Sequence, residues 1–197
     1  MLNVVGGINF WNFRRGLVAR ILQKKCILFL GAGATKESGR ALGSELGKYI
    51  YNQLGDIGID YKENLGKYTQ LLVNEGYRNE IEYLVRNRFS SLQPSSRFSN
   101  IANIPWKAIY TTNYDDLVEK SYSRQRFYNY EVKSSLNVGQ SIGDADVPIY
   151  KINGDINLPY QPTRPLVITI NDLRNNKKNN EKMISQLMKD CLLYTSP

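Results

Sequence analysis

The sequence predicts an α/β fold in which helices cover both faces of an open parallel sheet, with a small helical insertion. Three short apolar runs predict it, because each run ends abruptly at a turn of small or polar residues. These runs are Cys26 to Leu30, Lys107 to Tyr110 and Pro148 to Ile152. With 197 residues, the chain is long enough to form one such domain with a substantial core.

The composition excludes several kinds of chemistry. The chain has no histidine, so Ser-His-Asp and Cys-His catalysis, a histidine base and histidine-ligated zinc are excluded. Its two cysteines, Cys26 and Cys191, lie far apart in the sequence, which indicates neither a disulfide framework nor a zinc ribbon. We therefore expect no metal. The formal net charge of +8 favours an anionic ligand or nucleic acid, although the basic residues are scattered.

The first 25 residues are expected to form an N-terminal leader helix. Apolar residues recur at helical spacing between Asn12 and Lys25. The stretch lacks the pattern of a signal peptide, and no segment of the chain is long and apolar enough to cross a bilayer. We therefore expect a cytoplasmic protein with no membrane partner.

The run Cys26 to Leu30 has no polar alternation, as expected for a central strand that is buried on both faces. The turn Gly31-Ala32-Gly33 follows directly, and its small side chains would let backbone N–H groups approach a ligand. A helix after the turn would point its positive dipole end at it, which predicts a phosphate site. Packing alone could also explain the small residues. The stretch matches neither a Walker A loop nor the standard dinucleotide fingerprint, because Lys36 replaces the third glycine.

Helical spacing resumes after this turn. One helix is expected from Glu45 to Leu54, and residues 61–92 are expected to form the helical insertion in two pieces, separated near Asn74-Glu75-Gly76. The insertion could form one wall of a cleft, or it could serve helical packing alone.

The second apolar run ends at the polar stretch Thr111 to Asp116, which precedes a helix from Leu117 to Ser123. Ligands of open parallel sheets bind at the carboxyl ends of the strands. Thr112, Asn113 or Asp115 could instead cap the helix, but a cap requires only one such residue.

The third run ends at Asn153-Gly154-Asp155, so all three turns should meet at one edge of the sheet. Residues 166–170 are expected to form a fourth strand, and Asn171 or Asp172 is expected to cap a helix that continues through Met188.

The three turns together resemble the sirtuin-like superfamily, and more closely its bacterial antiphage-defence branch. Gly31 to Thr35 is similar to the family's Gly-Ala-Gly-x-Ser, and Thr111 to Asp115 is similar to its Thr-Gln-Asn-Ile/Tyr-Asp. Ile152 to Asp155 is similar to its His-Gly motif, with Asn153 in place of histidine. The resemblance covers residues 26–190 and implies a Rossmann-like, NAD-binding domain. Two distant cysteines cannot form the zinc module of deacetylating sirtuins, so the resemblance favours NAD hydrolysis over protein deacetylation.

The resemblance also implies roles for individual residues. Asn113 would position water or the ribose, Asp115 would hold the carboxamide or polarise the site, and Asn153 would bond a ribose hydroxyl; these three are the expected catalytic residues. NAD is expected as substrate or ligand, without a metal. The residues expected to bind it are Gly31, Ala32, Gly33, Thr35, Thr111, Thr112, Gly154 and Asp155.

Cleavage of the nicotinamide–ribose bond can proceed without histidine. The reaction passes through an oxocarbenium-like state, and the cationic nicotinamide leaves as a neutral molecule, so no general acid is required. The site must orient the carboxamide, stabilise the developing positive charge and place a water molecule.

We therefore expect an enzyme: an NAD glycohydrolase domain that is the effector of a larger antiphage-defence protein. Its expected partner is a downstream sensor or nucleotide-binding region of the same full-length chain, or a second copy in a homo-oligomer. The alternative is a catalytically weak or inactive sensor module that binds NAD or a related nucleotide, which Asn153 favours. Nucleic-acid binding through the +8 charge is a third reading, and it is not expected for this domain. Residues 191–197 resemble a translated adaptor, which suggests a fragment truncated at its C-terminus.

Overall fold

The computed structural model describes residues 4–5, 8–39, 43–55, 57–61, 64–134, 143, 145–159 and 165–192. Its elements, in chain order, are β1 (Val4–Val5), β2 (Ile8–Asn9), α1 (Phe10–Leu22), β3 (Ile27–Leu30), the 3-10 helix η1 (Ala32–Ser38), α2 (Gly43–Leu54), α3 (Leu65–Asn74), α4 (Arg78–Ser90), α5 (Ser96–Ser99), the 3-10 helix η2 (Asn100–Asn103), β4 (Ala108–Thr111), α6 (Leu117–Gln125), β5 (Tyr130–Lys133), β6 (Val147–Lys151), α7 (Ile170–Asn179) and α8 (Glu181–Leu192).

Four parallel strands form the central sheet in the order β3-β4-β6-β5. β3 pairs with β4 from Ile27 beside Ala108 to Leu30 beside Thr111. β4 pairs with β6, where Thr111 lies beside Lys151. Because the strands are parallel and in register, the carboxyl ends of β3, β4 and β6 lie next to one another. The predicted α/β fold with an open parallel sheet is therefore confirmed.

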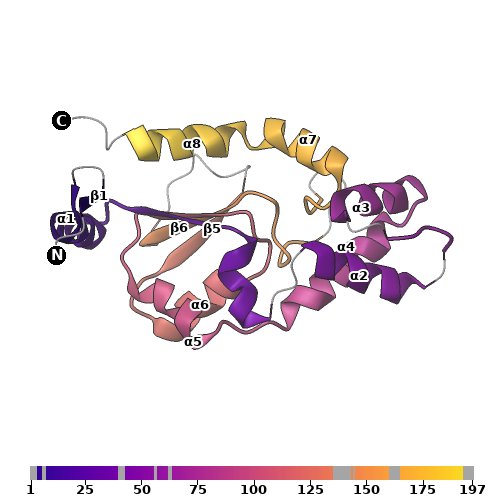
Figure 1. Cartoon of the computed structure of the whole chain (residues 1–197), viewed down its shortest axis with the longest axis horizontal. Coiled ribbons are helices and arrows are strands. Elements are labelled where there is room, and N and C mark those ends of the chain that lie inside the picture. Colours follow the sequence, from indigo (N-terminus) through magenta and orange to yellow (C-terminus); the bar gives the residue numbers. More distant parts are fainter. Residues whose placement is uncertain are drawn as a thin grey trace.

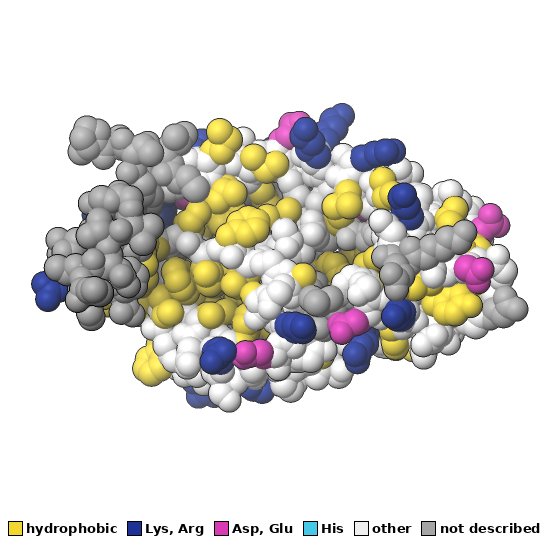
Figure 2. Space-filling model, viewed as in Figure 1, with side chains coloured by type: hydrophobic (Ala, Val, Ile, Leu, Met, Phe, Trp, Pro, Cys, Tyr) yellow, Lys and Arg dark blue, Asp and Glu magenta, His cyan; other side chains and the backbone are white. Residues whose placement is uncertain are grey.

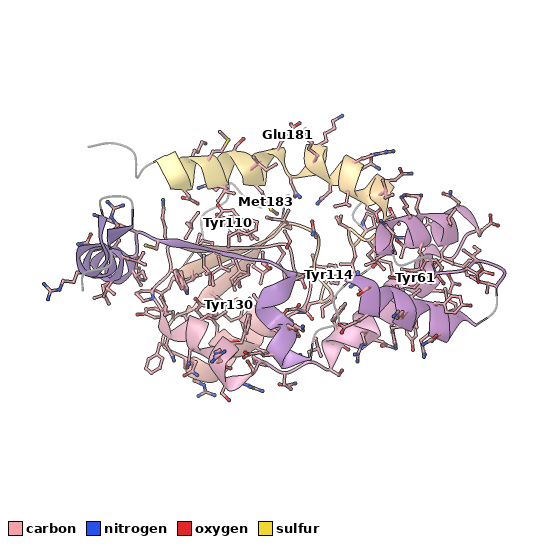
Figure 3. All side chains as sticks on the ribbon, viewed as in Figure 1. Tyr61, Tyr110, Tyr114, Tyr130, Glu181 and Met183 are labelled. Atoms are coloured by element: carbon pink, nitrogen blue, oxygen red, sulfur yellow. The ribbon has the colours of Figure 1, made fainter. Side chains whose placement is uncertain are left out.

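Helices cover both faces of this sheet (Figure 1). On one face, α5, η2 and α6 enclose a buried cluster that includes Leu117, Ile109 and Ile149. On the other face, α8 places Met183 near Tyr110 (Figure 3), in a cluster that also contains Tyr150. The rings of Tyr110 and Tyr150 stack with centroids 4.5 Å apart. The apolar runs of β4 and β6 are buried on both faces for this reason.

Three helices, α2, α3 and α4, form an arm at one end of the sheet (Figure 1). Their buried side chains include Ile50, Leu72, Ile81 and Phe89, all with no exposed surface. Tyr114 from the second turn belongs to the same cluster, and its ring meets Phe89 edge-on with centroids 5.5 Å apart. The arm therefore packs directly against the second turn.

The expectation that the first apolar run is a central strand is wrong for the described sheet. β3 lies at its edge, and Phe29 is 53% exposed. Figure 2 shows hydrophobic side chains at the surface between α8 and α6, over this part of the sheet. A short apolar run does not distinguish a central strand from an edge strand, because apolar residues alone do not specify the neighbours on either side.

The fourth strand expected at residues 166–170 is also wrong. Leu166 and Ile168 are buried, but no strand of the described structure pairs with this segment. The backbone N–H of Leu166 donates to the Glu82 carboxylate at 2.8 Å, and that of Val167 donates to the Asn153 carbonyl at 2.9 Å. These bonds satisfy the backbone, so a buried apolar segment exists here without a strand ladder.

The helix boundaries after this segment also differ from expectation. The N-cap of α7 is Thr169, not Asn171 or Asp172, and its hydroxyl and the Asp172 carboxylate form a reciprocal capping box. α7 ends at Asn179 and α8 begins at Glu181, where one continuous helix was expected.

β5 was not expected at all. No helix in the described ranges is long and apolar enough to traverse a membrane.

The packing of the arm gives the first testable prediction. Phe89→Ala removes a buried ring that contacts Tyr114, so we expect the free energy of unfolding to fall by about 3–5 kcal/mol. Chemical denaturation measures this change. Tyr83→Ala is the matched control, since Tyr83 lies on the same helix and is largely exposed. The free energy of unfolding of Tyr83→Ala should stay within about 0.5 kcal/mol of wild type. Equal decreases in the two variants would contradict the described packing.

Candidate active site

The side chain of Asn113 connects the first and second turns. Asn113 follows β4 by two residues and is 2% exposed. Its Nδ2 donates to the Gly31 carbonyl at 3.2 Å and lies 3.4 Å from Thr35 Oγ1. Its backbone N–H donates to Thr111 Oγ1 at 3.0 Å, which turns the chain sharply after the strand. The buried amide therefore holds the carboxyl ends of β3 and β4 together.

The orientation of this amide follows from its partners. A carbonyl oxygen only accepts hydrogen bonds, so the nitrogen of Asn113 must face Gly31 and the oxygen must face away. That oxygen, Oδ1, is buried and has no hydrogen-bond partner within the described part of the chain. A buried acceptor without a partner costs about 1–3 kcal/mol, and a bound water or hydroxyl group would satisfy it.

The first turn differs in one respect from its expected form. The residues after β3 form the short 3-10 helix η1, which ends at Ser38 and is capped by Gly39 with a φ of 80°, and α2 begins only at Gly43. The helix expected after the turn is therefore a short 3-10 helix, and it starts inside Gly31-Ala32-Gly33 rather than behind it. The glycines themselves leave room: a Cβ added to Gly31 or Gly33 would meet no described atom within 4 Å. Among the described residues, none blocks close approach to the backbone at these two glycines.

Asn153, in the third turn, is hydrogen-bonded at both ends of its amide. Its Nδ2 donates to the Thr112 carbonyl at 3.0 Å, which connects the third turn to the second. Its Oδ1 lies 3.4 Å from Asn176 Nδ2 on α7. Asn176 and Asn180 also donate to the Ile152 carbonyl, at 2.9 and 2.7 Å. Sequence reasoning missed these two asparagines, because their helix reads as a solvated polar face.

Gly154 has a local structural reason to be glycine. Its φ is 98°, a conformation that is unfavourable for residues with a Cβ. A Cβ there would also lie 3.0 Å from Leu166 Cδ2 and 3.4 Å from its Cα. Gly154 therefore differs from the two glycines of the first turn, where no described atom would meet an added Cβ.

Two of the expected acidic residues are buried in the same region. Asp115 Oδ1 accepts from the Leu117 backbone N–H at 3.3 Å, so this residue does contribute to the start of α6, as the capping alternative proposes. Asp155 Oδ1 accepts from Asn157 N–H and from Lys151 Nζ, both at 2.9 Å.

Lys151 and Glu119 form a buried ion pair that sequence reasoning missed. Lys151 Nζ lies 2.6 Å from Glu119 Oε1. Burial opposes the charge on the lysine, but Glu119 and Asp155 raise its pKa above the ordinary value. Burial in turn raises the pKa of the Glu119 carboxyl, against the opposing effect of Lys151. The signal in the sequence was a lysine inside an otherwise apolar strand, which requires a buried partner.

The structure therefore brings the three turns together at one edge of the sheet. Side-chain hydrogen bonds link Gly31, Thr35, Thr111, Thr112, Asn113 and Asn153 directly. The backbone adds further links, from Thr112 N–H to the Leu30 carbonyl at 3.1 Å and from Ile152 N–H to the Thr111 carbonyl at 2.8 Å. An open parallel sheet with polar turns at its carboxyl edge is the arrangement of a Rossmann-like fold.

Comparison with known proteins finds similarities to one group of proteins. Residues 107–196, a little under half of the chain, match the family model of the SIR2-like domain. The chain is 27% identical over 147 residues to "NAD(+) hydrolase ThsA" of Acinetobacter baumannii (strain 532279), which covers 74% of this chain and 30% of that protein. It is 28% identical over 172 residues to the protein of the same name from Enterococcus faecium, covering 84% of this chain and 34% of the relative. The Bacillus cereus (strain MSX-D12) protein of that name is 24% identical over 155 residues, and the match covers 76% of this chain and 32% of that protein. The chain thus spans about a third of the length of these relatives.

The contrast between the glycines gives a prediction about stability. Gly154→Ala forces a Cβ into a left-handed conformation against Leu166, so we expect a loss of about 1–3 kcal/mol in the free energy of unfolding. Gly33→Ala meets no described neighbour and should change stability by less than about 0.5 kcal/mol. Urea denaturation of both variants measures the difference. A loss at Gly33 as large as that at Gly154 would mean that the first turn uses its glycine for packing.

Proposed function

We propose that this chain is the NAD-cleaving domain of an NAD(+) hydrolase, and that it hydrolyses the nicotinamide–ribose bond. The observation that carries the proposal is the buried Asn113 amide, which joins two turns and keeps one acceptor without a described partner. The names of the relatives support NAD as the substrate. The resemblance to antiphage-defence proteins favours an effector in a larger cytoplasmic protein, whose downstream region or second copy would be the partner.

The first turn is proposed to hold the pyrophosphate. The backbone at Gly31, Ala32 and Gly33 can be approached closely, because no described side chain fills the space beside the two glycines. Thr35 is fully buried and lies against Asn113, so its proposed contribution is to fix the site. The ribose then reaches the second and third turns, where Thr111 and Thr112 shape the backbone around Asn113.

The proposed reaction requires no group that the chain lacks. The bond between the ribose carbon and the nicotinamide nitrogen breaks, and its electron pair neutralises the departing nicotinamide. A water held by Asn113 Oδ1 attacks the ribose carbon and releases a proton, so ADP-ribose and nicotinamide are the products. Asp115 is proposed to orient the carboxamide or to polarise the site. Glu119 and Asp155 both pair with the buried Lys151, and Asp115 is buried as well. These acidic side chains favour developing positive charge.

A sensor module that binds NAD or a related nucleotide without cleaving it is the second candidate. Asn153 favours it, since an amide cannot accept a proton as a base and both ends of this amide already have protein partners. Binding of NAD without release of nicotinamide would support the sensor, whereas release would support the enzyme.

Asn113→Ala tests the enzyme most directly. In the full-length protein we expect nicotinamide release to fall about 100-fold or more, because the variant loses both the water-holding oxygen and the link between the turns. Release is measured by chromatography with NAD as substrate. Asn87→Ala, at an exposed position of α4, is the matched control and should keep the wild-type rate. Unchanged release in Asn113→Ala would remove Asn113 from the mechanism.

The third turn gives a separate prediction. Asn153→His places a base where the family has one, and we expect nicotinamide release to rise about tenfold above pH 6.5, where a histidine with an ordinary pKa is neutral. Asn153→Gln keeps an amide and should produce no rise. If Asn153→His leaves NAD loss unchanged as well, this position does not limit the rate.

A further inference from the structure

We infer that Glu119 and Lys151 are positioning residues, whose buried ion pair sets the geometry of the third turn and thereby the rate of NAD cleavage. The inference rests on the proposed function for its reaction. Neither residue belongs to the three turns from which the resemblance to sirtuins was drawn.

The ion pair connects two elements that lead to and from the site. Glu119 is the third residue of α6, the helix that follows the second turn, and it is 6% exposed. Lys151 is the last residue of β6, directly before the third turn, and it is 3% exposed. The ammonium lies 2.6 Å from Glu119 Oε1 and 2.9 Å from Asp155 Oδ1. One cation therefore bonds to the helix on one side and to the third turn on the other.

The charge of Glu119 is compensated by Lys151, whereas Lys151 is compensated by both Glu119 and Asp155. The Glu119 carboxylate is buried, and Lys151 is the cation that lies against it, 2.6 Å from Oε1. A buried charge without its partner is strongly unfavourable. The position of Lys151, and with it the start of the third turn, is therefore fixed by Glu119.

The third turn is held at its far end by a different contact. Arg86 of α4 donates to the Ile156 carbonyl at 2.6 Å, and Arg86 is itself paired with the buried Glu82 at 3.2 Å. Loss of the Glu119–Lys151 pair should therefore loosen residues 153–155 without unfolding the domain. Asn153 lies in that loosened part, where it bonds to Thr112 beside Asn113.

This arrangement predicts an effect on rate rather than on affinity. The pyrophosphate would rest on the first turn, which neither Glu119 nor Lys151 contacts in the described structure. The reacting ribose would lie at the second and third turns, where small displacements of positioned groups reduce rates by about 100-fold.

The experiment compares Glu119→Gln and Lys151→Met with Asp190→Asn in the full-length protein. Asp190 is a matched control, since it is a buried carboxylate paired with Lys107 at 2.9 Å beside the amino end of β4, away from the three turns. We expect kcat for NAD cleavage to fall at least about tenfold in the first two variants, with KM for NAD within about twofold of wild type. The double variant should lose no more than the worse single variant, because the two residues act as one unit. Hydrogen exchange at residues 153–155 should accelerate in both single variants and remain unchanged in Asp190→Asn.

The outcomes separate the inference from the proposed function. Equal losses of kcat in all three variants, or a parallel change in kcat and KM, would mean that the pair serves stability alone and would overturn the inference. A wild-type protein that releases no nicotinamide would refute the proposed function. In that case, hydrogen exchange still decides whether the ion pair positions the third turn. Unchanged exchange at residues 153–155 in Glu119→Gln would overturn the positioning role, and accelerated exchange would support it.

Discussion

The hydrogen bond from the Asn113 amide to the Gly31 carbonyl is the interaction on which the arrangement of the site depends. Parallel strands bring their carboxyl ends to one edge, but the ladder stops where the turns begin. Beyond that point Asn113 connects the first turn to the second, and Asn153 connects the second to the third through the Thr112 carbonyl. Backbone hydrogen bonds align the strands within the sheet. Beyond the strand ends, hydrogen bonds from two asparagine side chains keep the turns aligned. The two amides differ in one respect: Asn153 has protein partners at both ends, whereas Asn113 donates to the protein and its Oδ1 has no partner among the described residues.

The helical arm supports the same turns from outside. Phe89 packs against Tyr114 of the second turn, and Figure 3 shows Tyr114 between the sheet and the arm. The Glu82 carboxylate accepts from Arg78 at 2.7 Å, from Arg86 at 3.2 Å and from the backbone of Leu166 at 2.8 Å. Through Arg86 this network reaches the third turn. The arm is therefore more than helices packed on one another, because it restrains two of the three turns.

The sequence predicted the features that depend on local pattern. β4 and β6 are apolar runs followed by polar turns, and the convergence of those turns follows from the parallel order of the strands. β5 was missed because Tyr130 to Lys133 is half charged, and its lysine is buried beside Glu131 in a way that periodicity does not reveal. Residues 166–170 were assigned wrongly because Glu82, far away in the sequence, satisfies their backbone. Glu119 and Lys151 were missed for the same reason: a charged residue usually faces solvent, and only the tertiary structure places these two side by side.

The central claim is that three segments distant in the sequence form one NAD site. Hydrogen exchange of the full-length protein, with and without a non-hydrolysable NAD analogue, tests it most directly. We expect the analogue to slow exchange in residues 31–35, 111–115 and 153–155 together. Slowed exchange in only one of these segments, or only at positions outside them, would contradict it.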